Sequence, residues 1–541
     1  MVFSMYMNKF LIFAGITALL AGCGGMNKSG HYNSIATSTP TDVQDSFLYS
    51  TALYGSDDGG PNANIAVLLP MTGDAKNIGN DIKTSIETAF LRKPKSNIKI
   101  SFYDLSGDDE YKYSVMRTAL NSNPDVVIGP LFAGDAKIIR DIKPGNLPVL
   151  SFTSDTTSLG DGVMTMNLIP TQSIETIVRQ MQYDGVTGLV LLAPNDNSGK
   201  TMVSVADSAS EFYNIPIKGI FYYEPGKSDS IKDTAIKSSM FNTRNAVNLR
   251  AREILSDILT KENLTQQTAN NLSAQLEKIS RNETLGDLPY DAILFLGNGS
   301  DSKTLASFLR YYGVSNRNVA FYGTTLWHDS NIISDFTMSG AKYATLPEIS
   351  ENFVRLYNMI SDQDPNYLTS FGYDAANLAL GMLFTQKTHD EYLYDPNGYV
   401  GTTGVFRIQP TGESERTLRI MELNGSATPR VFKESPENFL TPVYNVHVTK
   451  TTFLPEQELS TPGLNPGDYI KIPEYLKNKR EYRTKTIGAN YTPEEQAQAE
   501  TSEAIQIYSD PEDSKVENPD FEPVKKETIS RKYIDSVEVQ D

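Results

Sequence analysis

The segment Ile65-Ala66-Val67-Leu68-Leu69-Pro70-Met71-Thr72-Gly73 begins a repeating pattern that decides the fold class of this chain. Its five consecutive apolar residues are typical of a strand buried on both faces of a sheet, and Pro70 and Gly73 end the run. Apolar residues then recur every four positions from Ile78 to Phe90, which predicts a helix with one apolar face. The alternation continues with expected strands at 98–103, 126–128 and 148–152 and expected helices at 110–120 and 133–142. Strands that alternate with amphipathic helices predict an α/β fold with a doubly wound parallel sheet.

The alternation begins again near residue 171, which predicts a second α/β lobe. Its expected strands are 188–193, 216–222, 292–296 and 319–322, and its expected helices are 173–183, 201–213 and 302–312. Later segments, expected as helices near 347–360 and 373–384 and as strands at 404–408 and 418–423, return to the lobes. We expect a first lobe of about 64–168 plus the returning helices, and a second lobe of about 171–325. Two lobes joined by several crossings form a hinged cleft, which is a common place for a ligand.

A long polar stretch between Glu224 and Pro289 interrupts the second lobe. Apolar residues recur there at helical spacing, first from Val247 to Ile258 and then from Leu272 to Ile279. This pattern predicts a helical hairpin inserted into the second lobe over residues 225–289.

The N-terminal residues are typical of a secretion signal that ends in a lipidation site. An apolar run from Phe10 to Ala21 follows Lys9, and it is too short for a bilayer, which needs roughly 20 apolar residues. The run ends in Leu20-Ala21-Gly22-Cys23, where small residues let a peptidase reach the backbone before the thiol. Residues 1–23 are therefore expected to be a lipoprotein signal with the lipid on Cys23; the alternative is a plain secretion signal. No Asp follows Cys23, and this favours the outer over the inner membrane as the membrane that holds the lipid anchor.

The charge and composition limit the partners and the extent of the folded part. The chain has 48 Lys and Arg against 66 Asp and Glu, a net charge of −18, which argues against nucleic acid because its phosphates would be repelled. From Ala489 onward there are 14 acidic and 5 basic residues, so residues 450–541 are expected to be an acidic, largely disordered tail. Residues 24–63, rich in Gly, Ser, Thr and Asn, are expected to be a flexible tether. The folded domain is then expected over 64–449.

Several of these segments resemble known families. Residues 65–73, Val127-Ile128-Gly129-Pro130 and Val149-Leu150-Ser151-Phe152-Thr153 resemble type I periplasmic-binding proteins of the leucine-binding kind. Glu283-Thr284-Leu285-Gly286-Asp287-Leu288-Pro289-Tyr290-Asp291-Ala292 and Gly404-Val405-Phe406-Arg407-Ile408, with Ile420-Met421-Glu422-Leu423, are similar to the penicillin-binding protein activator (LpoA/LppC-like) lipoproteins. The resemblance covers roughly 64–423. It implies a lipoprotein on the periplasmic side of the outer membrane that stimulates a peptidoglycan synthase by direct contact. The best-known activators also carry a helical-repeat domain before the binding-protein-like domain. Because the tether is short, we expect no such domain here, and its contacts are not carried over.

The resemblance to leucine-type receptors also suggests residues for a ligand cleft. Ser151, Thr153 and Ser154 match the hydroxyl-rich loop of those receptors, and Asp329 matches the acidic residue that meets an amino group. Hydroxyls and backbone N–H groups at a helix N-terminus can hold a carboxylate, although ordinary turn and cap bonds would use the same residues. Thr72, Asn195 and Asn298 complete the set of ligand-cleft candidates. The loop 194–198 lacks the aromatic residue that those receptors usually place there.

Enzyme and metal motifs are not found in the sequence. Gly199-Lys200-Thr201 follows a strand, but Pro194 stands where a phosphate-binding loop needs its first glycine. The four histidines are dispersed, and no Gly-x-Ser-x-Gly is present to supply a nucleophile. Asp104, Asp108 and Asp109 lack the spacing of a calcium loop. We therefore expect no catalytic residue, no metal site and no cofactor.

Two functions remain open at this point, while a hydrolase is disfavoured because no catalytic constellation is present. The first is a non-catalytic activator that binds a peptidoglycan synthase. The alternative is a leucine-type receptor that delivers amino acids or related small molecules to an ABC transporter. The hairpin insert and the altered cleft loops favour the activator.

Overall fold

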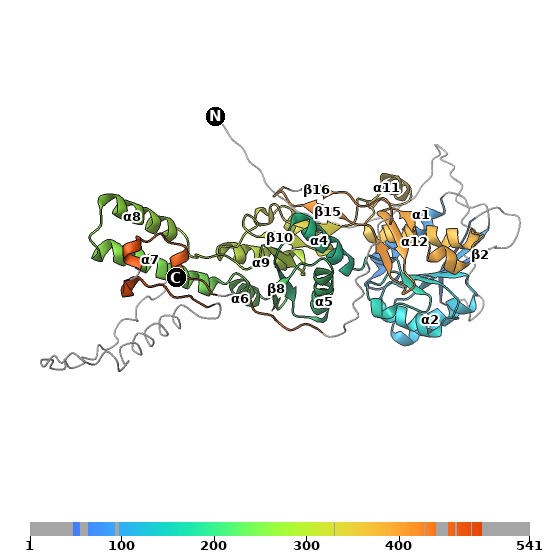
Figure 1. Ribbon diagram of the computed structural model, residues 1–541. Coiled ribbons are helices and arrows are strands. Elements are labelled where there is room, and N and C mark those ends of the chain that lie inside the picture. Colours follow the sequence, from blue (N-terminus) through green and yellow to red (C-terminus); the bar gives the residue numbers. More distant parts are fainter. Residues whose placement is uncertain are drawn as a thin grey trace, which may run out of the picture.

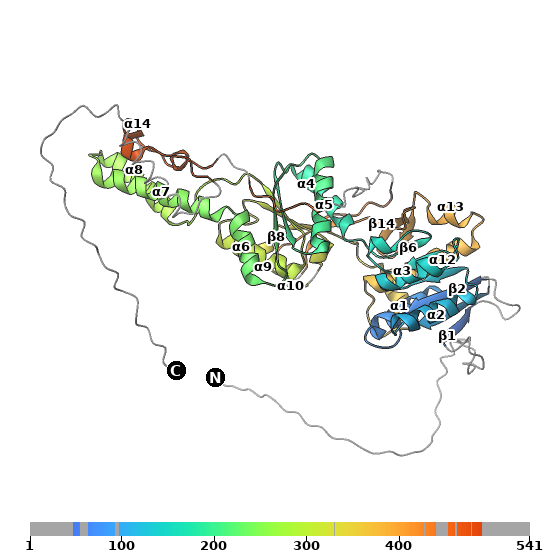
Figure 2. The same ribbon diagram turned by 90° about the horizontal axis from the view of Figure 1, so that it is seen from below.

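The computed structural model describes residues 47–54, 63–91, 97–328, 330–426, 428–439, 453–459, 463–477 and 479–488 of the chain. They form three parts in a row, namely a first lobe, a second lobe and a helical hairpin at the far end (Figures 1 and 2). Each lobe contains one large sheet with helices packed on it. The expectation of a two-lobed, doubly wound α/β fold is therefore confirmed.

The first lobe is built on a six-stranded sheet of order β1-β3-β2-β4-β5-β6. Its strands are β1 Leu48–Tyr54, β2 Ala63–Leu69, β3 Ile98–Asp104, β4 Val126–Ile128, β5 Val149–Ser151 and β6 Val163–Thr165. Its helices are α1 Lys76–Ala89, α2 Asp109–Asn121, α3 Ala133–Ile142, α11 Glu351–Tyr357, α12 Tyr367–Phe384 and α13 His389–Leu393. Strands β2 to β6 are parallel, and residues 65–69 are all buried, as a sheet covered on both faces requires. Helix α12 packs against α1, so a late segment completes this lobe as expected.

The expectation of a flexible tether over 24–63 is wrong for its last part. Strand β1 pairs with β3 in antiparallel orientation and forms one edge of the sheet. Tyr54 stacks on Phe90 with ring centroids 4.8 Å apart, and Phe47 meets Tyr111 edge-on at 5.5 Å. These aromatic contacts fix a segment whose composition alone indicates a loop.

The second lobe is built on a seven-stranded sheet of order β16-β15-β11-β10-β9-β7-β8. Its parallel strands are β7 Leu189–Pro194, β8 Ile217–Tyr223, β9 Ala292–Phe295, β10 Ala320–Gly323 and β11 Lys342–Thr345, and its antiparallel strands are β15 Arg419–Glu422 and β16 Arg430–Lys433. Its helices are α4 Thr171–Asp184, α5 Asn197–Phe212, α6 Ser228–Ser238, α9 Gly299–Tyr311 and α10 Ser330–Ile333. Trp327, the only tryptophan of the chain, is fully buried in this lobe.

The helical insert exists, but it begins later than residue 225. Helix α6 packs on β8 and α9, and its Ile231 and Ala235 belong to the core of the second lobe. The projecting hairpin consists of α7 Phe241–Lys261 and α8 Gln266–Ser280. Periodicity could not separate α6 from the hairpin, because all three helices have polar outer faces.

The expectation of a largely disordered tail from residue 450 is also wrong for its first part. Gln457 and Ile220 exchange two backbone hydrogen bonds of 2.9 Å, which cover the outer edge of β8. Residues 463–488, here named the strap, run along the hairpin and back, and Leu464 bridges to Ile487 where the two ends meet. The strap contains the short helix α14 Glu474–Lys477 at its outer turn. Residues 489–541 lie outside the described residues.

The hairpin and the strap share an apolar core. The strap contributes Ile470, Leu476 and Tyr482, each 6% exposed or less, and these pack on the apolar faces of α7 and α8. Gln275 of α8 holds the strap by pairing with the backbone of Lys471. Hairpin and strap are therefore one structural unit, which we name the arm.

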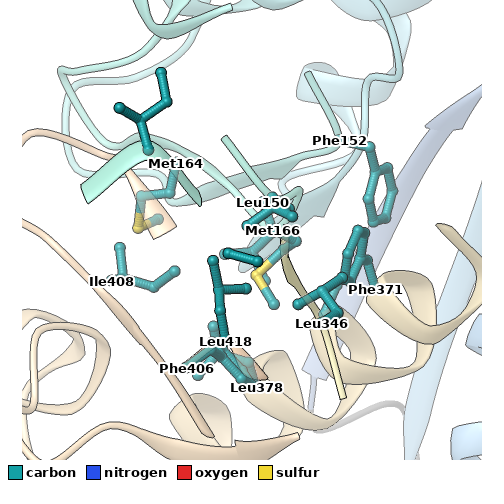
Figure 3. Packing of buried hydrophobic residues seen from close by; sticks show 14 of the residues in the cluster. Leu150, Phe152, Met164, Met166, Leu346, Phe371, Leu378, Phe406, Ile408 and Leu418 are labelled. Atoms are coloured by element: carbon teal, nitrogen blue, oxygen red, sulfur yellow. The ribbon is translucent and has the colours of Figure 1, made fainter. Parts of the chain in front are cut away.

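A small antiparallel sheet lies where the lobes meet. It consists of β12 Tyr399–Gly401, β13 Gly404–Ile408 and β14 Ser414–Arg416. The three chain segments that cross between the lobes contribute Met166, Leu346 and Leu418 to one buried cluster (Figure 3). The short 3₁₀ helices elsewhere are η2 Thr156–Ser158, η3 Thr325–Trp327, η4 Phe336–Met338, η5 Pro466–Asp468 and η6 Arg480–Tyr482.

Candidate functional site

The strand ends of the first lobe hold one of the ligand candidates in an internal network. The hydroxyl of Thr72 donates to Asp104 Oδ2 at 2.5 Å, and the Met71 N–H donates to Asp104 Oδ1 at 2.7 Å. Burial alone would raise the pKa of Asp104, but hydrogen bonds from Ser106, Thr72 and Met71 lower it. Asp104 therefore stays ionised and closes the loop after β2, and the Thr72 hydroxyl is engaged in that loop.

The hydroxyl-rich loop after β5 also bonds mostly to its own lobe. Ser151 is fully buried and donates to the carbonyl of Met164 at 2.8 Å, so it faces the interior rather than a cleft, contrary to the expectation. The Thr153 hydroxyl accepts from the Asp155 N–H at 3.0 Å. Ser154 is exposed, and of these three it alone presents its side chain at the surface.

The candidates of the second lobe are exposed and serve local bonds. Asn195 donates through Nδ2 to Glu224 at 2.9 Å, and Asn298 accepts from the Asp301 N–H at 2.8 Å as the N-cap of α9. Asp329 lies outside the described residues. Among the described residues, no hydrogen bond joins a candidate of the first lobe to one of the second. Their joint use by a ligand stays a prediction.

Strand β14 of the small sheet forms hydrogen bonds with the first of the three segments that cross between the lobes, although the two are far apart in the sequence. Gln172 donates to the carbonyl of Ser414 and accepts from the Arg416 N–H at 3.2 Å. The Ser414 hydroxyl donates to the carbonyl of Asn167 at 2.5 Å. Strand β14 is therefore fastened along the crossing segment.

A buried ion pair lies beside the same crossing. The guanidinium of Arg416 is 3.6 Å from the carboxylate of Asp374, and both side chains are almost completely buried. Arg416 also donates to the carbonyl of Met166 at 2.6 Å and lies over the rings of Phe371 and Phe406. Burial raises the pKa of Asp374 and lowers the pKa of Arg416 to about 10, and each charge opposes the shift of the other. Neither residue was identified from the sequence.

A second buried carboxyl group follows the first crossing. Glu175 of α4 is 8% exposed, and burial raises its pKa to about 7, which the neighbouring charge of Glu415 reinforces. Arg179 and a 3.4 Å hydrogen bond from the Tyr213 hydroxyl act in the opposite direction. The folded chain therefore favours the protonated form of Glu175 well above the usual range of a glutamate.

This shift predicts that the second lobe loses stability as the pH rises. Below about pH 4.5 Glu175 is protonated in both the folded and the unfolded chain, so the fold keeps its full stability. Between about pH 4.5 and 7 the unfolded chain releases this proton and the folded chain keeps it, so the free energy of unfolding falls by about 3 kcal/mol. Glu175→Gln should remove most of that loss. Urea unfolding followed by Trp327 fluorescence at pH 5 and pH 8 measures it, with the exposed Glu211→Gln as the control. An equal pH dependence in wild type and Glu175→Gln would contradict the argument.

The arm is fastened to the second lobe by one buried arginine. Arg244 of α7 is 7% exposed and donates to the carbonyls of Gly286 at 3.0 Å and Ser239 at 3.2 Å. Its own carbonyl accepts from the Leu285 N–H at 3.0 Å. The segment Thr284-Leu285-Gly286, which the sequence singled out, therefore forms the base of the arm. Burial lowers the pKa of Arg244, while the fork geometry of a guanidinium suits several carbonyls at once.

The described residues contain no group of three or more His, Cys, Asp and Glu side chains that could hold a metal ion. None of the described helices combines the length and the apolar character that a membrane span requires. A hollow of about 490 Å³ lies on α9 and is lined by residues between 300 and 308, and by none of the ligand candidates.

Comparison with known proteins gives two results on the family. Residues 36–212 match the family model described as "LppC putative lipoprotein". The resemblance to the activator lipoproteins is confirmed. The "Penicillin-binding protein activator LpoA" of Haemophilus ducreyi is 21% identical over 401 residues, which cover 72% of this chain and 56% of the relative. The protein of the same name from Pasteurella multocida is 23% identical over 197 residues, which cover 33% of this chain and 31% of the relative. The chain therefore spans about half the length of the first of these relatives and about a third of the length of the second.

Solved structures support the fold. A structure described as a "putative branched-chain amino acid ABC transporter" from Rhodospirillum rubrum matches with a TM-score of 0.52 at 16% identity. The match covers 68% of this chain and 99% of the other. At that identity the likeness concerns the fold alone, and the two-lobed type I periplasmic-binding protein fold is confirmed.

Proposed function

We propose that this chain is a non-catalytic lipoprotein that binds and stimulates a peptidoglycan synthase in cell-wall synthesis. The observation that carries the proposal is the 401-residue similarity to a protein named as a penicillin-binding protein activator. The matched region includes most of the described residues, so the proposal concerns both lobes. The synthase itself would be a penicillin-binding protein on the periplasmic side of the membrane.

The geometry of the cleft candidates supports this proposal over the amino-acid receptor. A receptor needs side chains that are open to a ligand and lobes that close around it. Here the Ser151 hydroxyl is buried and bonded inward and the Thr72 hydroxyl donates to Asp104, whereas Ser154, Asn195 and Asn298 are exposed. An activator needs an exposed surface, and the arm projects from the second lobe away from the first (Figure 1).

The arm gives a direct test of the function. The variant replaces residues 246–281 by a Gly/Ser linker and ends after Leu459, so that α6, Arg244 and the cover of β8 are kept. We expect both lobes to stay folded, as judged by Trp327 fluorescence, while binding to the synthase is lost. Tagged wild type and variant are incubated with solubilised membranes of the source bacterium, and the recovered penicillin-binding proteins are detected with fluorescent penicillin.

The chain ending after Gly488 serves as the matched control, because its arm is complete. It should recover the same penicillin-binding protein as wild type. The competing result is micromolar binding of leucine or a related amino acid by wild type in calorimetry, with no penicillin-binding protein recovered. That result would reject the activator and establish the receptor.

We also propose that Cys23, which lies outside the described residues, anchors the chain by its lipid on the periplasmic side of the outer membrane. Cys23→Ser should move the protein from the membrane pellet to the soluble periplasmic fraction, because the chain has no second thiol for the lipid. Separation of inner and outer membranes on a density gradient identifies the membrane that holds wild type. If the Cys23→Ser variant still pelleted with membranes, another surface would be the anchor.

A further inference from the structure

The arm differs in charge from the rest of the molecule. Its hairpin residues 241–283 and strap residues 463–488 carry twelve basic and eight acidic side chains, a net charge of +4. The whole chain has a net charge of −18, so the remainder carries −22. Residues 489–541, which follow the strap, carry −9 of this charge, and the rest of the chain outside the arm carries −13. The arm is therefore the part whose net charge is opposite to that of an acidic partner surface.

The excess of cations lies on the strap. It carries six basic and three acidic residues, and its Lys471, Lys477 and Arg483 are exposed. Lys477 pairs with Glu474 at 2.6 Å, whereas no ion pair of Lys471 or Arg483 is found within the described residues. Tyr475, at the outer turn of the strap, is 63% exposed although it neighbours the buried Leu476. Exposed tyrosine and arginine side chains are the types that dominate the energy of protein interfaces.

We propose that the strap face of the arm is a cationic docking surface for an acidic patch on the partner protein, an inference that rests on the proposed function. The charge contrast would orient the two proteins before contact, and Tyr475 would supply an apolar anchor within the charged surface. The arm lies at the end of the molecule opposite the first lobe, which holds β1, the first described element (Figures 1 and 2). The arm and the first described element therefore lie at opposite ends of the described structure; with the lipid on Cys23, as proposed above, this position favours a protein partner over the anchoring membrane.

Charge reversal on the full chain tests the inference. The strap variant is Lys471→Glu/Lys477→Glu/Arg483→Glu, whose side chains are exposed and do not enter the core of the arm. The control is Arg117→Glu/Lys232→Glu/Arg317→Glu, which changes the net charge by the same amount at exposed positions of the two lobes. Surface plasmon resonance measures the association rate with the purified penicillin-binding protein that wild type recovers, at low and at high salt.

We expect the strap variant to associate about tenfold more slowly than wild type at low salt, and the control to differ by less than about twofold. High salt should slow wild type toward the rate of the strap variant, because it screens the same attraction. Equal rates for wild type and the strap variant, or equal losses in both variants, would overturn the docking surface while leaving the activator function intact. If wild type bound no penicillin-binding protein, the function itself would fail and the inference with it.

A sedimentation assay tests whether a lipid or a glycan binds the strap face instead. Vesicles of phosphatidylglycerol and purified peptidoglycan are each sedimented with wild type and with the strap variant. One outcome would assign the surface to a lipid or a glycan and overturn the proposal. In it, wild type binds the vesicles or the peptidoglycan, the strap variant does not, and both bind the synthase equally. Absence of such binding, with the slowed association described above, supports the acidic protein surface.

Discussion

Ending the chain after Leu459 is expected to unfold the arm while both lobes stay folded. The truncation removes Ile470, Leu476, Tyr482 and Ile487, all of which are buried against the hairpin. Burial of one such side chain contributes about 1.5–3 kcal/mol, so four of them supply roughly 6 kcal/mol or more before the cost of ordering the strap. After the truncation α7 and α8 keep only their packing on each other, and most of the stability of a helix in a protein comes from such tertiary packing.

Two measurements separate the arm from the lobes. Far-UV circular dichroism should lose the helical signal of α7 and α8, whereas unfolding followed by the buried Trp327 should keep its midpoint, because Leu459 and the bridge at Gln457 remain. The chain ending after Gly488 should behave as wild type in both measurements. Full helical signal in the chain ending after Leu459 would show that the hairpin is stable alone and that the strap only lies on it.

The sequence predicts best those elements whose signal is local. The bounds of β2 and α1 are predicted to within about two residues by the apolar run Ile65–Leu69 and the amphipathic segment that follows it. This works because the pattern of buried residues lies within one strand and one helix. The strand and helix alternation that begins again near residue 171 likewise indicates the second lobe. Helix α6 shows the limit of this reasoning, since its spacing equals that of the hairpin and only its contacts with α9 and β8 assign it to the lobe.

The parts that the sequence does not predict depend on contacts between distant residues. The strap has few and irregularly spaced apolar residues, and they are buried only because Leu476 and Tyr482 meet helices about 200 positions earlier. Strand β1 owes its order to pairing with β3, although the stretch before it has the composition of a loop. The hydroxyl of Ser151 could be matched to a receptor loop by its position, but its direction toward Met164 depends on the neighbouring strand β6.

The ion pair of Asp374 and Arg416 is the clearest case, because its partners come from α12 and β14 and share no motif. Asp374 accepts a hydrogen bond of 2.9 Å from the Thr402 N–H, and Arg416 reaches the first crossing at Met166. The pair therefore connects the returning helix, the small sheet and the lobe crossing. In such a buried position, the charge of the partner is the main compensation for the desolvation of Asp374, and the hydrogen bond from the Thr402 N–H adds to it.

Asp374→Ala is therefore expected to destabilise the chain by about 3–5 kcal/mol, because it leaves the Arg416 guanidinium buried without its counter-charge. Asp374→Asn/Arg416→Met should cost less than half as much, since it removes both charges and keeps an acceptor for the Thr402 N–H. Urea unfolding followed by circular dichroism compares Asp374→Ala with the double variant, and the single variants Asp374→Asn and Arg416→Met complete the double-mutant cycle. Equal losses in Asp374→Ala and in the double variant would mean that packing, rather than the unpaired cation, sets the cost at this lobe crossing.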